Sequence, residues 1–142
     1  MHPGIRDRGG SMQIHAFRLN PGQDLDEQIE AYLFDKHIEA GCMLSAVGSL
    51  TSVRLRLANR EHHSEFEGPF EIVSITGTVS TYGSHLHVSV SDGDGKTLGG
   101  HLVAGCTIYT TAELVIAEFD EMVFTREMSE DSGYEELVVR LR

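Results

Sequence analysis

Three histidines carry the clearest chemical signal in this sequence. His85 and His87 flank one apolar residue in a segment that alternates apolar and polar side chains, and His101 follows two glycines further along the chain. In a strand, residues i and i+2 project from the same face, so the imidazoles of His85 and His87 are expected to lie side by side. Three imidazoles suit Zn²⁺ or another divalent transition metal, with a fourth position open to water or a small-molecule ligand.

Other readings of the histidines and of a nearby cysteine stay open at this point. His85, His87 and His101 are also consistent with core or surface residues that hydrogen-bond to their neighbours, because their spacing is less restrictive than paired CxxC motifs. His62 and His63 are adjacent and lie in an acidic segment, where we expect a solvated loop. Cys106 is either a soft ligand beside His101 or, as we expect, a small buried residue.

A carboxylate and two arginines are further candidates. Glu113 interrupts the apolar run 107–117, so it either faces an active cleft as a general acid or base or pairs with an arginine. Arg54 and Arg56 occupy alternate positions of one predicted strand and are expected to share a face. They are candidates for contacts to an anion or a nucleic acid, or for ion pairs on an acidic surface.

One helix is predicted near the N-terminus. Asp24 and Glu27 form a capping-box pattern at the start of a segment with apolar residues at helical spacing, and Gly41 is expected to be its left-handed C-terminal cap. From residue 42 onward the apolar period changes from 3.6 to 2, which predicts strands. With a first strand at 13–19, the predicted strands are 43–47, 52–58, 70–80, 85–91, 96–103, 107–118 and 134–141.

The turns and loops between these strands determine which strands pair, and therefore where the histidines lie. Gly48 is expected to end one strand, and the segments 61–68 and 127–133 are expected to be polar loops. The run Asp92-Gly93-Asp94-Gly95 predicts a tight turn, so the segment 85–103 forms a hairpin that carries all three histidines. One helix followed by about seven strands predicts an α+β domain with a mostly antiparallel, strongly twisted sheet, closing toward a barrel or a sandwich.

Length and composition fit one domain of a soluble protein. The chain has 142 residues, and we place a single domain at 12–142. Residues 1–11 are polar and Gly-rich and are expected to be a disordered leader or an expression remnant. No stretch approaches the roughly 18 apolar residues of a membrane span, and no secretory signal is present, which predicts a cytoplasmic protein with free Cys42 and Cys106 thiols and no membrane partner.

The charge balance argues against several functions. Eleven Lys and Arg residues stand against 22 Asp and Glu residues, which gives a formal net charge of −11 at pH 7. Such a surface repels phosphates, so DNA binding by the isolated domain is doubtful. The sequence also has no P-loop and no GxSxG motif, which argues against phosphate cradling by a glycine-rich loop and against a serine hydrolase.

Four linked segments resemble the plants-and-prokaryotes conserved (PPC) domain. They are 68–74 (GPFEIVS), 83–92 (GSHLHVSVSD), 99–102 (GGHL) and 111–116 (TAELVI), and the likeness extends from about residue 12 to residue 141. Plants carry this domain beside AT-hooks in nuclear proteins, whereas prokaryotes carry it alone; this sequence has no AT-hook. The resemblance implies an α+β fold with a mostly antiparallel sheet, a homotrimer, and the family description of predicted DNA-binding protein.

The resemblance also bears on the candidate site. In prokaryotic members, the histidines that match His85, His87 and His101 surround a bound metal, usually zinc. A remoter likeness to acetolactate decarboxylase, which shares the fold and a three-histidine zinc site, suggests Lewis-acid chemistry, with Glu113 as the residue to test. If sites lie between subunits, Arg54 or Glu113 would complete a neighbour's histidine cluster.

Three functions therefore follow from the sequence and the resemblance. The first is a homotrimeric zinc-binding protein with a small-molecule ligand or an undescribed reaction. The second is a DNA-binding or transcription-associated regulatory module, and the third is a protein-interaction scaffold. We favour the first, because the three histidines support it directly.

Overall fold

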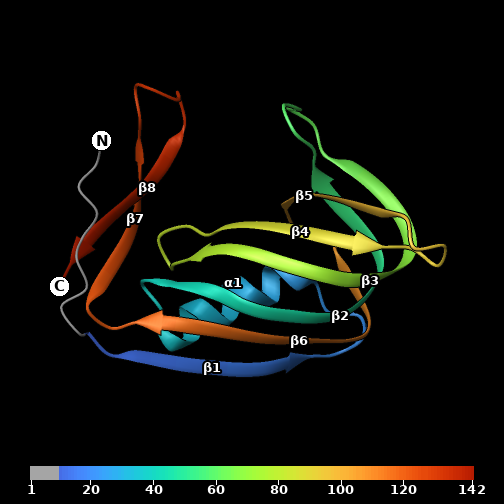
Figure 1. Ribbon diagram of the computed structural model, residues 1–142, viewed down its shortest axis with the longest axis horizontal. Coiled ribbons are helices and arrows are strands. Elements are labelled where there is room, and N and C mark those ends of the chain that lie inside the picture. Colours follow the sequence, from blue (N-terminus) through green and yellow to red (C-terminus); the bar gives the residue numbers. More distant parts are fainter. Residues whose placement is uncertain (1–9) are drawn as a thin grey trace.

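A computed structural model describes residues 10–142 and has one helix and eight strands in that range (Figure 1). The predicted α+β class with a mostly antiparallel sheet and a helix near the N-terminus is confirmed. Residues 1–9 of the expected leader 1–11 lie outside the described residues. The elements are β1 (Met12–Leu19), α1 (Leu25–Lys36), β2 (Gly41–Arg56), β3 (Ser64–Val79), β4 (His85–Ser91), β5 (Thr97–Leu102), β6 (Thr107–Phe119), β7 (Met122–Met128) and β8 (Glu135–Leu141).

Six strands form one antiparallel sheet in the order β1-β6-β2-β3-β4-β5. The end of β2 also pairs with β5, through Leu55 with Leu102 and Arg56 with His101. This extra pairing joins β2, β3, β4 and β5 into a closed, barrel-like unit. Strands β7 and β8 form a separate two-stranded sheet, which stands to one side of the large sheet in Figure 1.

Helix α1 packs against one face of the six-stranded sheet and lies behind it in Figure 1. Its residues Leu25, Ile29 and Leu33 are fully buried, as expected for one apolar face at a spacing of four residues. The prediction that Gly41 caps the helix is wrong. His37 is the left-handed cap instead, because the buried Ile38 turns the chain back and its N–H donates to the Leu33 carbonyl at 3.0 Å. Within residues 10–142, no helix is long and apolar enough to cross a membrane.

Strand β2 runs without interruption through Gly48, so the predicted break there is wrong. Gly48 has a φ of +154°, and a Cβ at this position would lie 2.1 Å from the carbonyl oxygen of Thr111 on β6. Glycine is needed here because the two backbones approach closely at a register shift. The predicted loop 61–68 is partly strand, since β3 begins at Ser64, and β7 lies where no strand was predicted.

The predicted hairpin is confirmed, with its turn at Asp92–Gly95. The Asp92 N–H donates to the Lys96 carbonyl at 2.9 Å, and the Asp92 carboxylate accepts from the N–H groups of Asp94 and Lys96, both at 2.9 Å. This turn sets the register in which His87 pairs with His101. The acidic glycine-rich tip therefore positions two of the three histidines.

The sheet face away from α1, here called the outer face, carries the histidines. Cross-strand partners share a face, and the register links Ile14 to Ala117, Cys42, Thr78 and His85 across five strands. Leu86 and Val88 alternate with the histidines and point into the core. Several large apolar side chains on the strands of this sheet are more than half exposed: Met12, Ile14, Leu44, Val47 and Val73.

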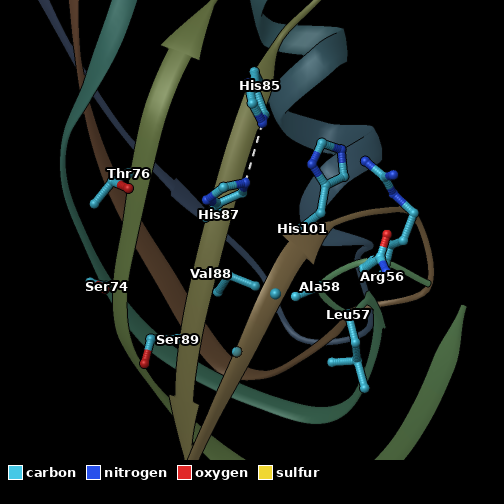
Figure 2. Close-up of a pocket in the computed structure, with 13 residues that line it drawn as sticks. Arg56, Leu57, Ala58, Ser74, Thr76, His85, His87, Val88, Ser89 and His101 are labelled. Carbon is cyan, nitrogen blue, oxygen red and sulfur yellow. Dashed lines mark hydrogen bonds between the residues drawn. The ribbon is translucent and has the colours of Figure 1, made fainter. Parts of the chain in front are cut away.

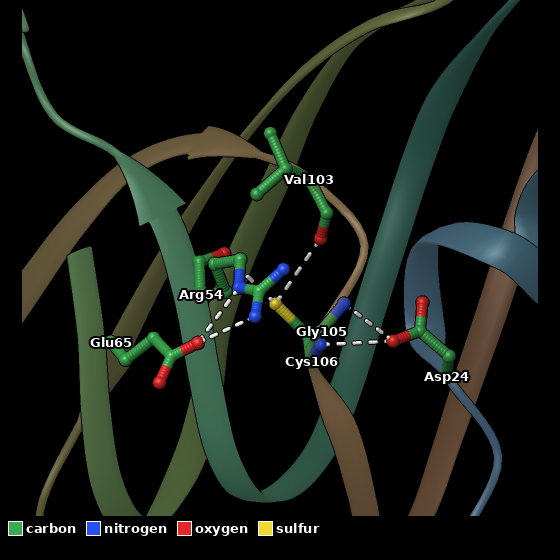
Figure 3. A network of polar contacts seen from close by, with 6 residues as sticks. All are labelled: Asp24, Arg54, Glu65, Val103, Gly105 and Cys106. Atoms are coloured by element: carbon green, nitrogen blue, oxygen red, sulfur yellow. Dashed lines mark hydrogen bonds and ion pairs between the residues drawn. The ribbon is translucent and has the colours of Figure 1, made fainter. Parts of the chain in front are cut away.

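A polar network ties α1 to the loop that follows β5 (Figure 3). One carboxylate oxygen of Asp24 accepts from the Glu27 N–H at 3.0 Å, which caps the helix. The other accepts from the N–H groups of Gly105 at 2.6 Å and Cys106 at 3.0 Å. Because this loop directly follows the strand with His101, Asp24 connects the helix to the position of the histidine strand.

Cys106 lies in the same network. Its Sγ donates to the Arg54 carbonyl at 3.3 Å and the Val103 carbonyl at 3.5 Å, and its side chain is fully buried. Burial raises the pKa of the Cys106 thiol to about 11. The residue therefore acts as a small buried thiol rather than as a ligand, and both Cys42 and Cys106 are free.

We expect Asp24→Ala to lower the free energy of unfolding by about 2–4 kcal/mol, because it removes a helix cap and leaves two loop N–H groups without their charged acceptor. Urea unfolding at pH 7 measures this. Asp35→Ala, which removes an exposed carboxylate near the other end of α1, should change the same quantity by less than about 0.5 kcal/mol. Equal effects of the two substitutions would contradict the role of Asp24.

Candidate metal centre

The structure brings His85, His87 and His101 together on the outer face (Figure 2). His85 and His87 occupy alternate positions of β4, and His101 lies directly across from His87 on β5. The Nε2 atoms of His85 and His87 are 3.2 Å apart. The ring centroids are separated by 4.9 Å for His85 and His87, 5.3 Å for His85 and His101, and 5.8 Å for His87 and His101.

This cluster fits a small divalent metal. One ring nitrogen from each histidine lies within 4.8 Å of the other two. Zinc bound to three imidazoles at tetrahedral angles holds its nitrogens about 3.4 Å apart, so small ring rotations suffice to bring the three to one ion. The Nδ1 atom of His101 is buried and has no hydrogen-bond partner among residues 10–142. A buried ring nitrogen without a partner is costly, and a metal or a proton donor would relieve that cost.

The electrostatics of the cluster keep two of its imidazoles neutral. Burial, followed by the positive charge of Arg56, lowers the pKa of His101 from 6.5 to about 4. Burial, followed by the neighbouring His87 and by Arg126, lowers the pKa of His85 as well. Neutral imidazole is the form that binds a metal, so both rings are ready ligands at pH 7.

A cavity of about 450 Å³ lies beside the histidines and is lined by the end of β2, the residues that follow it, and parts of β3, β4 and β5. Its size suits a small molecule. The walls combine apolar side chains with the hydroxyl groups of Ser74, Thr76 and Ser89, and Gly99 and Gly100 present bare backbone (Figure 2). Thr76 is the cross-strand partner of His87, so its position follows from the register of β3 with β4.

The two arginines of β2 have different surroundings. Arg54 pairs with Glu65, its cross-strand partner on β3, at 2.6 and 3.0 Å (Figure 3). Arg56 lines the cavity beside His101 (Figure 2). They differ because β2 still pairs with β3 at Arg54, whereas at Arg56 its partner is β5.

The remaining candidates do not line the cavity. Glu113 is exposed on the outer face, with Arg18 and Val47 as its cross-strand partners, and β2 and β3 separate its strand from β4. His62 and His63 are exposed in the segment before β3. Within one chain, Glu113 does not lie at the cavity. Its role as a catalytic group therefore stays a prediction.

Arg126 also lies near the site, although its sequence context does not predict this. It comes from β7, donates to the Thr78 hydroxyl at 2.9 Å, and lines a space beside His85. No local pattern marks it, because its position depends on how the β7–β8 ribbon meets the large sheet.

Comparison with known proteins places the chain in a family. The model of the Plants and Prokaryotes Conserved domain, abbreviated PCC or PPC, matches residues 6–120. The chain belongs to this family. A bifunctional protein GlmU from Synechococcus sp. (strain JA-3-3Ab) contains a segment that is 43% identical over 128 residues and covers 90% of this chain. The chain spans only 21% of the length of that relative.

Two solved structures are similar over nearly the whole PPC domain. A hypothetical protein from Salmonella cholerae-suis is 39% identical with a TM-score of 0.93, covering 96% of this chain and 99% of the other. A metal-containing protein from Archaeoglobus fulgidus is 26% identical with a TM-score of 0.80, covering 94% of this chain and 99% of the other. The predicted family and fold are thus confirmed.

We expect the free energy of unfolding of the metal-free protein to fall as the pH is lowered from about 6.5 toward 4. In this range the unfolded chain protonates His101 with an ordinary pKa of 6.5, whereas the folded chain does so near 4. The lowered pKa of His85 acts in the same direction. Urea unfolding of the chelator-treated protein at pH 7.5 and pH 5 measures the loss.

His101→Asn should reduce this pH dependence, since it removes the group with the lowered pKa. His62→Asn, which removes an exposed histidine, should leave it unchanged. A wild-type protein that is equally stable at both pH values would contradict the prediction.

Proposed function

We propose that this PPC-domain protein binds a divalent transition metal, zinc as the first candidate, through His85, His87 and His101. The convergence of three ring nitrogens within 4.8 Å of one another carries the proposal. The neutral state of His85 and His101, the unpartnered Nδ1 of His101 and the adjoining cavity support it. The similar protein from Archaeoglobus fulgidus is described as metal-containing, which also favours a metal here.

The surroundings of the histidines suit a small-molecule ligand. A metal held by three histidines supplies a Lewis acid with a free coordination position. The hydroxyl groups of Ser74, Thr76 and Ser89 line the cavity and would orient a polar ligand, and Leu57 adds an apolar side chain to the lining. A reaction of the ligand would need a general acid or base beside it. Glu113 is the candidate for this role, and it would have to come from another copy of the chain.

DNA binding has less support in this chain. The charge of −11 opposes the neutralisation of phosphates, and in the large sheet Arg18 and Arg54 bond to neighbouring side chains, which leaves them less free for a nucleic acid. A role as an assembly module is compatible with the metal site, because the Synechococcus relative carries a similar segment within a much longer protein.

We also propose that the chain assembles as a homotrimer through its outer face. Met12, Ile14 and Val47 are more than half exposed there. Exposed apolar side chains on a sheet face favour an interaction surface in soluble proteins. Because Glu113 shares this face with the histidines, a trimer offers a route by which Glu113 reaches a neighbour's cavity.

For the metal site, we expect about one zinc ion per wild-type chain after zinc loading and dialysis, and almost none in a His85→Ala, His87→Ala, His101→Ala variant. Elemental analysis of the purified proteins measures both. A His62→Ala, His63→Ala variant is the matched control, since it removes two exposed histidines outside the cluster, and it should retain wild-type metal. Equal metal content in the triple variant and the wild type would refute the site.

For the assembly, we expect light scattering to give a wild-type mass of three times the 15.7 kDa chain. An Ile14→Asp, Val47→Asp variant should be monomeric, because it places two charges in the apolar outer face. Phe34→Asp is the control, since Phe34 is 74% exposed but lies on α1. A monomeric wild type would refute the trimer, and a trimeric Ile14→Asp, Val47→Asp variant would refute this interface.

A further inference from the structure

The cavity beside the histidines has an unusual charge composition. The chain has twice as many acidic as basic residues, yet none of the described residues that line this cavity is Asp or Glu. Apart from the histidines, Arg56 is its one charged lining residue in the described part of the chain. A ligand in the cavity therefore meets positive charge without a compensating carboxylate.

Arg56 is held at the edge of this cavity without a partner of its own. Its backbone pairs with His101, and its guanidinium lies beside the His101 ring (Figure 2). Among residues 10–142, no side-chain hydrogen bond or ion pair involves Arg56, in contrast to Arg54 two residues earlier, which is bound to Glu65. A half-buried guanidinium with no protein acceptor is suited to bind an external acceptor.

The neighbouring space does not have the same excess of positive charge. Toward the β7–β8 ribbon, Arg60 and Arg126 are accompanied by Glu61, Glu135 and Glu136. Basic and acidic residues are equal in number there when Arg56 is counted, because Arg56, His85 and His101 line both spaces. Among these described residues, lining without any carboxylate is therefore found only on the side of Arg56 and the histidines that faces the cavity of about 450 Å³.

A bound metal increases this imbalance. Three neutral imidazoles contribute no negative charge, so a divalent ion in the cluster retains its full charge, to which Arg56 adds one more. Sites of this kind reach neutrality by taking an anion. An oxyanion can place one oxygen toward the metal and another toward the guanidinium, which binds planar or tetrahedral oxyanions through paired N–H groups.

We propose that the ligand of this site is a small molecule bearing an oxyanion group, a carboxylate or a phosphate, which Arg56 and the metal bind together. The inference rests on the metal site proposed above. The hydroxyl groups of Ser74, Thr76 and Ser89 then face the uncharged part of the ligand, and the volume of about 450 Å³ limits it to a small molecule. Arg56 is thus the residue that selects an anion over a neutral ligand.

Cobalt-substituted protein tests the proposal, because the visible spectrum of Co²⁺ responds to a change in its ligands. Titration of the cobalt-loaded wild type with acetate and with inorganic phosphate should give a saturable spectral change for at least one of them. The anion that binds more tightly identifies the group. In Arg56→Gln the dissociation constant should rise about tenfold or more with unchanged cobalt content, and Arg56→Lys should fall between the two.

Arg54→Gln is the matched control, since it removes the same charge from the same strand at a residue already paired with Glu65, and it should keep the wild-type affinity. Thermal unfolding verifies that each variant is folded. Unchanged anion affinity in Arg56→Gln, or no spectral response of cobalt-loaded wild type to either anion, overturns the inference while the metal site stands. Failure of the wild type to bind cobalt refutes the metal site and the inference with it.

Discussion

The pairing of the last residues of β2 with β5 is the constraint on which the site depends. Over most of its length β2 lies between β6 and β3, but Leu55 and Arg56 pair with Leu102 and His101. This contact closes the sheet and fixes β5 on both edges, between β4 and β2. His101 is thereby held between the histidines of β4 and the guanidinium of Arg56, so one backbone contact brings together the groups of the cavity.

The part of the site that the sequence predicts follows from local rules. Alternation in a strand places His85 and His87 on one face, and the Asp92–Gly95 turn sets the hairpin register that brings His101 opposite His87. These rules need only nearby residues. The α+β class follows similarly, because Asp24 and the spacing of Leu25, Ile29 and Leu33 define the helix locally.

The features that the sequence does not predict depend on distant contacts. Gly48 is typical of a strand end, yet β2 continues through it. A glycine is needed at this position because the Thr111 backbone of β6 approaches too closely for a Cβ atom. Gly41 resembles a helix cap, but burial of Ile38 ends the helix earlier. Arg54 and Arg56 look equivalent in the sequence. They differ because the strand that pairs with β2 changes from β3 at Arg54 to β5 at Arg56, which leaves Arg54 in an ion pair and Arg56 without one among the described residues.

The contrast between the net negative charge of the protein and the local positive charge of the cavity is compatible with the proposed anionic ligand. At a net charge of −11, the surface repels extended polyanions such as DNA, because the repulsion adds up over many phosphates. A small oxyanion meets only the local field of the cavity, where the described lining has no carboxylate and Arg56 is free. Screening over about 8–10 Å at physiological salt weakens the distant acidic groups more than the contacts inside the cavity. The proposed site would therefore discriminate by size as well as by charge, and would favour small anions over nucleic acid.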